Sequence, residues 1–292
     1  MARALRLAER GQYTAHPNPM VGCVLVKGDA IVGEGWHEKT GEAHAEVNAL
    51  RRAGEAARGS TAYVTLEPCS HHGKTPPCSE ALIKAGVRKV IVAIQDPLQR
   101  SSGHGLERLL EAGIEVQSGL MQSAAEELNR GFLMRAARQR PFVRLKLAAS
   151  IDGAISMASG ESQWITSPAA RADVQRLRAR SGAIMTGIGT VLADDPSLTV
   201  RAADIETGGI QPIRVVLDRH LRIPASAAML NLEGTTLVCC TDDHDATHLL
   251  SSNAEVVSFS SVDGRVNAHE VLMELAARGV SNALVEAGPS LA

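Results

Sequence analysis

The sequence has few aromatic residues: three Phe, two Trp and two Tyr among 292 positions. A row of rings on which single-stranded nucleic acid could stack is therefore not expected. An excess of positive charge is also absent, since the formal net charge is −2 and no run of Lys or Arg is longer than two. Both absences argue against a nucleic-acid partner.

Long apolar stretches and abundant cysteines are absent as well. No uninterrupted apolar stretch reaches the length of a membrane-spanning helix, and the N-terminus lacks the apolar core of a signal peptide. Five cysteines do not form a disulfide-dense framework in a chain of this length. The sequence therefore predicts a cytoplasmic protein without a membrane partner.

The order of the predicted elements indicates an α/β protein with two domains. Apolar strands alternate with helices throughout, and the composition changes around Arg138–Pro141. We therefore expect one domain over residues 1–138 and a second over 142–292. In the first we predict helices at 2–10, 43–57, 79–85, 106–111 and 123–138, with Ser79 as an N-cap, and strands at 21–26, 31–32, 62–66, 87–94 and 114–116. In the second we predict helices at 168–179 and 268–278, and strands at 142–149, 183–186, 213–217, 235–240 and 282–286.

One histidine and two cysteines stand where predicted elements begin or end. His44 lies at the start of a helix, Cys69 follows a buried strand, and Cys78 immediately precedes a helix. A thiolate at a helix N-terminus has a lowered pKa, which suits Cys78 as a ligand. Two thiolates and an imidazole form the set that a catalytic zinc takes when its fourth position stays open for water. Glu46 follows His44 by two residues and is placed to shuttle protons.

This combination partly matches the signature of zinc deaminases, His-x-Glu followed by Pro-Cys-x-x-Cys, in which the glutamate is the acid and base. The match is partial because Cys69 and Cys78 are nine positions apart rather than three. Each residue alone is more often a buried core residue than a ligand. The ordered set favours a metal site, with a closed structural zinc site as the other interpretation.

Polar residues near this set are candidates for substrate contacts. Asn18 stands between two prolines, which hold it in an extended turn that presents its amide, although a plain turn is commoner. His71 and Lys74 could meet a phosphate or a sugar, or could equally be solvated.

In the second domain the local signals are weaker. Gly187–Thr190 follows a buried strand, where backbone N–H groups can approach a phosphate, but a plain turn is the commoner interpretation. Arg178 and Arg201 suit phosphate because a guanidinium binds it in a bidentate fork, yet each alone is more often a surface charge. Asp194 could equally belong to a solvated turn.

Several longer segments, spread over both predicted domains, match the motifs of one protein family. They are Pro17–Gly22, His44–Glu46, Thr65–Cys78 with its nine-residue spacing between cysteines, Leu145–Gly153, Ser159–Thr166, Thr186–Arg201 and Val285–Pro289. Together they resemble the bifunctional deaminase–reductases of bacterial riboflavin biosynthesis, and the resemblance covers essentially the whole chain.

The resemblance implies a cytidine-deaminase-like α/β/α domain followed by a dihydrofolate-reductase-like α/β domain. Zn²⁺ held by His44, Cys69 and Cys78, with Glu46 as proton shuttle, would serve the deamination of 2,5-diamino-6-ribosylamino-4(3H)-pyrimidinone 5′-phosphate. NADPH would then reduce the ribosylamino group to ribitylamino. The implied partner is a small phosphorylated pyrimidine, and we expect a homo-oligomer.

The resemblance also implies roles for single residues. Lys146 is expected to act on the ribose during reduction. Substrate contacts are implied for Asn18, His37, His71 and Lys74 in the first domain, and for Ser162, Arg178, Leu198, Arg201 and Glu286 in the second. Contacts to NADPH are implied for Ala148, Trp164, Thr190, Asp194 and Gly288.

Two features depart from the family pattern. After Asp96-Pro97 the family continues with Asn-Pro, whereas this chain has Leu98–Gly103. Family members also continue some tens of residues beyond the Gly288 loop, whereas this chain stops at Ala292. From this we expect a C-terminally incomplete reductase sheet with unpaired edges.

Three alternative functions follow from these observations. The first is a deaminase alone, with a non-functional reductase remnant, and NADPH oxidation separates it from the bifunctional enzyme. The second is a nucleic-acid base deaminase, which the charge and the few aromatics oppose. The third is a zinc-stabilised binding module without catalysis, which would tolerate the loss of the Glu46 carboxylate.

Overall fold

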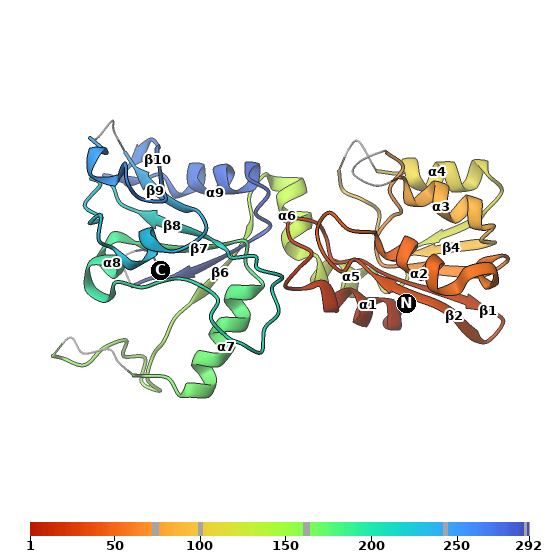
Figure 1. The fold of residues 1–292 in the computed structure, drawn as a ribbon, viewed down its shortest axis with the longest axis horizontal. Helices are drawn as coiled ribbons and strands as arrows, with labels where there is room; N and C mark the ends of the chain where they lie inside the picture. Colours follow the sequence, from red (N-terminus) through yellow and green to blue (C-terminus); the bar gives the residue numbers. More distant parts are fainter. Residues whose placement is uncertain (72–75, 99–101, 160–163, 242–244, 289–290, 292) are drawn as a thin grey trace. The chain divides into compact units, whose positions relative to one another are not determined.

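The computed structural model describes residues 1–292 apart from 72–75, 99–101, 160–163, 242–244, 289–290 and 292. The chain forms two compact units, Met1–Arg138 and Gln139–Ala292, each built around its own sheet (Figure 1). Within the described ranges, every helix is too short or too polar to cross a membrane.

The first unit is a five-stranded sheet in the order β2-β1-β3-β4-β5. Strand β1 is antiparallel to both of its neighbours, while β3, β4 and β5 are parallel. The strands are β1 (Gly22–Lys27), β2 (Ala30–Trp36), β3 (Thr61–Val64), β4 (Lys89–Val92) and β5 (Glu115–Ser118). The helices are α1 (Ala2–Ala8), α2 (Ala45–Ala53), α3 (Cys78–Ala85), α4 (His104–Glu111), α5 (Gln122–Leu128) and α6 (Arg130–Arg138), with 3-10 turns at Glu9–Gly11 and Gly54–Ala57.

Alternating side chains of β1 supply the two faces of this sheet. Cys23 and Leu25 are fully buried in the core that includes residues of α2, α3 and α4. Val24 points to the other face and packs with Ala4 and Leu7 of α1. Because successive side chains of a strand point to opposite faces, one strand joins two helical layers. The first unit is therefore an α/β/α sandwich, as the sequence predicts.

Glycines let helix α2 lie unusually close to strand β2. A Cβ atom on Gly35 would lie 2.4 Å from the carbonyl oxygen of Ala45, and one on Gly33 would lie 2.4 Å from that of Ala49. Any larger residue would therefore push the helix backbone away. Since α2 begins directly after His44, this contact sets where the histidine stands.

Three local predictions for the first unit are corrected. The helix predicted at 123–138 is broken between α5 and α6, because the Asn129 side chain accepts a hydrogen bond from Met20 N (2.9 Å) and donates one to Met20 O (2.8 Å). The helix predicted at 43–57 starts at Ala45, where His44 is the N-cap, and tightens into the 3-10 turn at Gly54–Ala57. Ser79 is not an N-cap, because α3 already begins at Cys78 and the Ser79 hydroxyl donates to the carbonyl of Cys69.

The second unit is built on a six-stranded parallel sheet in the order β10-β9-β8-β7-β13-β6, with a separate β11–β12 hairpin. The strands are β6 (Phe142–Lys146), β7 (Ala183–Gly187), β8 (Ile213–Leu217), β9 (Thr236–Cys240), β10 (Ala254–Ser258), β11 (Ser261–Val262), β12 (Arg265–Val266) and β13 (Asn282–Glu286). The helices are α7 (Pro168–Ala179), α8 (Ile188–Asp194) and α9 (Ala268–Ala277), with 3-10 turns at Ala228–Asn231 and Thr247–Leu249.

Two apolar cores cover the two faces of this sheet. Ile184 and Val216 pack with residues of α8 on one face, while Met185 and Val215 pack with residues of α9 on the other. Helices on both faces explain why the central strands are almost continuously apolar. The predicted α7, β8 and β13 have the observed boundaries.

Helix α8 and strand β10 are not predicted from the sequence. Gly187 and Gly189 suggest a turn, but Gly187 is the N-cap of α8, and the helix starts at the next residue. At the other side of the sheet, β6 pairs with β13 and, within the described residues, with no other strand. The side chains of Val143 and Leu145 on β6 are 38% and 45% exposed.

We expect Gly35→Ala to lower the free energy of unfolding of the first unit by about 2 kcal/mol, because the added methyl group overpacks the contact between β2 and α2. The chain has two tryptophans, so Trp164→Phe leaves Trp36 of β2 as the only indole reporter for urea denaturation. Gly189→Ala is the matched control, since a Cβ atom there would meet no atom within 4 Å. An unchanged transition for Gly35→Ala would contradict this account.

Candidate active site

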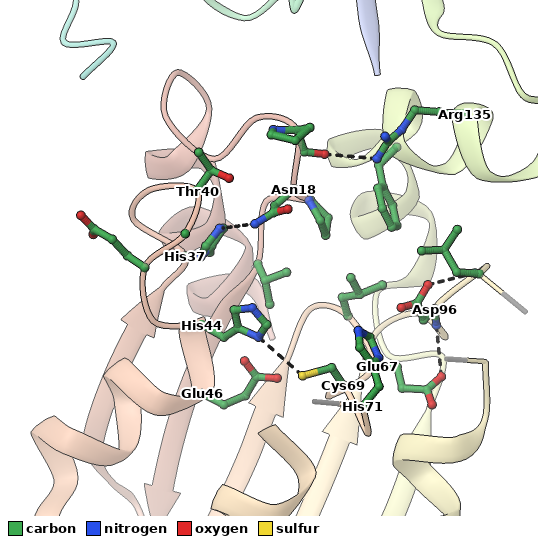
Figure 2. A pocket seen from close by; sticks show the side chains of 18 residues that line it. Asn18, His37, Thr40, His44, Glu46, Glu67, Cys69, His71, Asp96 and Arg135 are labelled. Carbon is green, nitrogen blue, oxygen red and sulfur yellow. Dashed lines mark hydrogen bonds between the residues drawn. The ribbon is translucent and has the colours of Figure 1, made fainter. Parts of the chain in front are cut away.

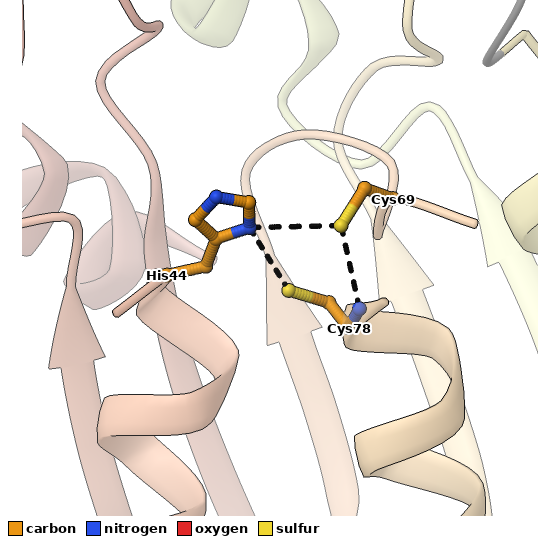
Figure 3. Close-up of side chains that lie close together, drawn as sticks. All are labelled: His44, Cys69 and Cys78. Carbon is orange, nitrogen blue, oxygen red and sulfur yellow. Dashed lines mark hydrogen bonds between the residues drawn. The ribbon is translucent and has the colours of Figure 1, made fainter. Parts of the chain in front are cut away.

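His44, Cys69 and Cys78 converge beyond the carboxyl end of β3 (Figure 3). His44 Nδ1 lies 3.2 Å from Cys78 Sγ and 3.6 Å from Cys69 Sγ. The three ligand atoms all lie within 4.8 Å of one another. These separations suit the edges of one tetrahedral coordination shell of thiolate and imidazole ligands. The convergence therefore favours candidate ligands over plain core residues as the interpretation of this pair of cysteines.

The candidate ligands come from two helix N-termini and one loop. His44 is the residue before α2, Cys78 is the first residue of α3, and Cys69 lies in the loop after β3. The backbone N–H of Cys78 donates a hydrogen bond to Cys69 Sγ at 3.3 Å. The first turn of α3 thus orients the thiol of another segment (Figure 3).

The sequence predicts a lowered pKa for Cys78 at the helix N-terminus, but in the structure the lowered pKa belongs to Cys69. The Cys78 thiol and backbone N–H both stabilise a Cys69 thiolate by hydrogen bonding, and they lower the pKa of Cys69. That same hydrogen bond, together with burial, raises the pKa of Cys78. The helix N-terminus therefore lowers the pKa of the thiol that faces it rather than that of the residue on it.

Glu46 is buried beside these ligands on the first turn of α2. Its Oε2 atom has no hydrogen-bond partner among the described residues. Burial, followed by the nearby Cys69 thiolate, raises the pKa of Glu46 to about 7. A buried carboxyl with one oxygen free is suited to accept and return a proton. The sequence also predicts Glu46 near the start of this helix, two residues after His44.

A cavity of about 410 Å³ adjoins the ligands and contains most of the implied contacts of the first unit (Figure 2). Asn18, His37, His44, Glu46, Cys69 and His71 line it. Lys74 and residues 99–101 of the unusual loop lie outside the described residues, whereas Leu98 lines the cavity. The structure thus brings the described candidates of this unit around one space.

Asn18 and His37 form a small polar network in this cavity. His37 Nδ1 donates to the carbonyl of Ala43 at 3.3 Å, so its Nε2 accepts a hydrogen bond from the Asn18 amide nitrogen at 3.0 Å (Figure 2). Burial lowers the pKa of His37, which favours this neutral form. The amide oxygen of Asn18 is then left to accept a hydrogen bond from a ligand.

Glu67, Asp96 and Arg135 also line the cavity, and sequence reasoning misses them as site residues. The Glu67 carboxylate accepts backbone hydrogen bonds from Asp96 (3.1 Å), Gly103 (3.1 Å) and Gly105 (3.0 Å). Glu67 lies within the segment Thr65–Cys78 that matches the family motif. Its position in that segment is the one feature of the sequence that could mark it as a site residue. Arg135 lies 57 residues beyond the end of that segment at Cys78, and no local motif in the sequence marks it as a site residue.

In the second unit, three of the implied residues form one charged cluster. The carboxylate of Glu286 accepts hydrogen bonds from Arg178 Nε (2.6 Å) and Nη2 (2.9 Å), and Lys146 Nζ lies 3.7 Å from Glu286 Oε2. Arg178 is buried and also donates to the carbonyl of Thr199 at 3.0 Å. Arg178 thus holds Glu286, and Glu286 faces the ammonium of Lys146.

Several implied cofactor residues lie near one edge of the second sheet. Lys146, Glu286 and Gly187 end three adjacent parallel strands, so Ala148 and Gly288 follow carboxyl ends at the same edge. This edge is where ligands bind in open α/β sheets. Cβ atoms added to Gly187, Gly189 or Gly288 would meet no atom within 4 Å, which leaves space for a bound group.

The other implied residues of this unit are more scattered. Thr190 and the exposed Asp194 lie one turn apart on α8, and the exposed Trp164 ring is covered by Arg171, whose Cζ is 4.4 Å from the ring centre. Leu198 packs in the core, so a substrate contact there would come from its backbone. Arg201 is exposed, and Ser162 lies outside the described residues.

Comparison with protein families gives a match for each half of the chain. Residues 1–94 match the model of the cytidine and deoxycytidylate deaminase zinc-binding region. Residues 141–292 match the model of the RibD C-terminal domain. The first match includes all three clustered ligands, and the second includes the charged cluster around Glu286.

Relatives match over the whole chain. The riboflavin biosynthesis protein RibD of Escherichia coli is 50% identical over 100% of this chain and 82% of its own length, and that of Aquifex aeolicus is 42% identical over 99% and 80%. A solved RibD structure from Acinetobacter baumannii has a TM-score of 0.89 at 46% identity, covering 99% of this chain and 80% of that one. A deaminase/reductase structure from Thermotoga maritima has a TM-score of 0.85 at 35% identity, covering 99% and 79%. The chain therefore belongs to the RibD family of bifunctional riboflavin-biosynthesis enzymes, with a cytidine-deaminase-like domain followed by a RibD reductase domain.

Proposed function

We propose that this enzyme deaminates 2,5-diamino-6-ribosylamino-4(3H)-pyrimidinone 5′-phosphate and then reduces the ribosylamino group of the product to ribitylamino. We assign the zinc-dependent deamination to residues 1–138 and the NADPH-dependent reduction to residues 142–292. The observation that carries the first assignment is the convergence of His44, Cys69 and Cys78 beside Glu46. The solved relative from Thermotoga maritima is described as a deaminase and reductase of this substrate class.

The donor set of the first unit fits zinc. Two thiols and one imidazole meet within one coordination shell, and zinc binds both kinds of ligand. When bound, zinc supplies Lewis-acid activation of a water molecule near neutral pH. The rest of the reaction is assigned to side chains of this chain.

Glu46 would move the proton during deamination. Its carboxylate takes a proton from the attacking water and gives it to the leaving nitrogen, so the amino group departs as ammonia and oxygen replaces it on the ring. The pKa of Glu46, raised by burial, allows both transfers. Asn18 would accept a hydrogen bond from the heterocycle, while His37 fixes the Asn18 amide.

The charged cluster of the second unit would act on the ribose. Bound NADPH would supply the hydride for this reduction at the sugar carbon bonded to nitrogen. The sugar ring opens in the reduction, so its ring oxygen must gain a proton. Lys146 would supply that proton, and Glu286 would hold the ammonium in place. Arg178 orients the Glu286 carboxylate through two hydrogen bonds.

The match to the RibD C-terminal domain favours two activities over a deaminase with a non-functional reductase remnant. The 50% identity to a whole-chain RibD relative favours a small phosphorylated pyrimidine over nucleic acid as the substrate. A homo-oligomeric, cytoplasmic enzyme stays a prediction, which sedimentation and cell fractionation would test.

We expect Glu46→Gln to lower ammonia release about 10²- to 10⁴-fold, because the amide cannot shuttle the proton. Zinc content, measured by atomic absorption, should stay at the wild-type level, since Glu46 is not one of the three clustered ligands. Glu55→Gln changes an exposed carboxylate and is the control. Full ammonia release by a zinc-loaded Glu46→Gln enzyme would exclude Glu46 as the proton carrier and favour a binding module.

Removal of the metal should separate the two activities. We expect a chelator, or either Cys69→Ser or Cys78→Ser, to abolish ammonia release and to remove about one zinc ion per chain. NADPH oxidation with the deaminated compound as substrate should persist. Cys240→Ser is the matched control, since that thiol lies in the second unit. Loss of zinc from the control as well would argue against this ligand assignment.

Lys146→Gln should lower NADPH oxidation about 10²- to 10⁴-fold without affecting ammonia release, because the amide cannot donate the required proton. The control is Arg144→Gln, an exposed position two residues earlier on β6. Steady-state kinetics of NADPH oxidation would measure both variants. Equal activity of the Lys146 variant and the wild type would contradict the proposed role.

A further inference from the structure

The cavity of the first unit has several acidic side chains and few cations. Glu42, Glu46, Glu67 and Asp96 line it. Among the lining residues that the structure describes, Arg135 is the one arginine or lysine. Carboxylates repel a phosphate unless a cation offsets them, and the substrate of the proposed deamination carries a phosphate. Arg135 is therefore the described lining residue that could offset the charge of a phosphate in this cavity.

Arg135 is held at the cavity wall with most of its donors free. One of its N–H groups donates to the carbonyl of Pro17 at 3.2 Å, and its Cζ lies 5.9 Å from the centre of the Phe132 ring. A guanidinium has five N–H donors. Within the described part of the chain, Arg135 has no carboxylate partner, and the bond to Pro17 leaves other donors for a ligand.

The surroundings of Arg135 make a bound anion favourable. Burial lowers the pKa of Arg135, but an arginine stays charged in proteins. A partly buried charge without a counter-ion is costly, and an anionic ligand would offset that cost. The neighbouring His16 cannot compete as a cation, because burial and the charge of Arg135 lower its pKa to about 4.

We propose that Arg135 binds the phosphate of the deaminase substrate and selects the phosphorylated pyrimidine over its unphosphorylated form. The proposal rests on the deaminase function proposed above. Guanidinium and phosphate match in a bidentate fork, which makes arginine suited to this contact. Figure 2 shows Arg135 across the cavity from Glu46, so the phosphate and the reacting amino group would occupy separate ends of the space.

If Arg135 had only a structural role, its substitution would affect the two forms of the substrate differently from the way proposed here. If its only task were to hold the loop at Pro17, its loss would disturb that loop for every substrate alike. A phosphate contact affects only the substrate that carries a phosphate. Comparing the nucleotide with its phosphatase-treated nucleoside therefore separates the two roles.

The experiment measures ammonia release by the zinc-loaded 292-residue chain with each of these two compounds. Arg135→Gln loses the charge and the guanidinium fork. Arg135→Lys keeps the charge but loses the fork. Arg130→Gln, at the exposed first residue of the same helix, is the matched control.

We expect Arg135→Gln to raise KM for the nucleotide about 10- to 100-fold, the effect of losing charge-assisted hydrogen bonds, with little change for the nucleoside. Arg135→Lys should lie between this variant and the wild type, and Arg130→Gln should match the wild type. Ribose 5-phosphate should inhibit the wild type competitively, whereas ribose should not.

Equal effects of Arg135→Gln on both compounds, or no effect on either, would overturn the proposal. A wild type that releases ammonia equally well from both compounds would overturn it while leaving the deaminase function intact. A wild type that releases ammonia from neither would refute the deaminase function and this proposal together. Circular dichroism checks folding, and Arg135→Lys decides the question if the glutamine variant does not fold.

Discussion

The approach of helix α2 to strand β2 is the contact on which the active site of the first unit depends. The backbones meet where Gly33 and Gly35 have no side chain, and the helix therefore starts close to the sheet. That start places His44 within reach of thiols from a loop and from a second helix. The absence of a Cβ atom at these two glycines therefore helps to set the position of His44 relative to the two cysteines.

The cluster also concentrates groups that are negative or become negative. Cys69, Cys78 and Glu46 are close together and largely removed from water, so ionisation of one opposes ionisation of the others. A bound divalent cation would reverse this balance, because the thiolates would become its ligands and the carboxylate would face positive charge. Relief of the repulsion among these groups would therefore contribute to the free energy of metal binding.

Sequence patterns predict the layered α/β architecture well because its central strands are almost continuously apolar. They predict the ligands because the motif residues lie within thirty-five positions of one another. They fail where tertiary contacts decide the outcome. The helix predicted at 123–138 breaks because Asn129 pairs with the distant Met20 backbone, and α8 forms although two glycines suggest a turn. Arg135 escapes notice for the same reason, since only folding brings it to the cavity.

Glu67 links the loop that carries Cys69 to the start of helix α4. No side chain of α4 itself caps that end, because Gly103 is the N-cap, and the Glu67 carboxylate from another segment accepts the N–H groups of Gly103 and Gly105 instead. Fraying of α4 would therefore strip a buried carboxylate of its donors. Local opening of the helix and loosening of the Cys69 loop would therefore occur together as one cooperative event. The amide hydrogen-exchange rates of Gly103 and Gly105 would then report on the order of the Cys69 loop.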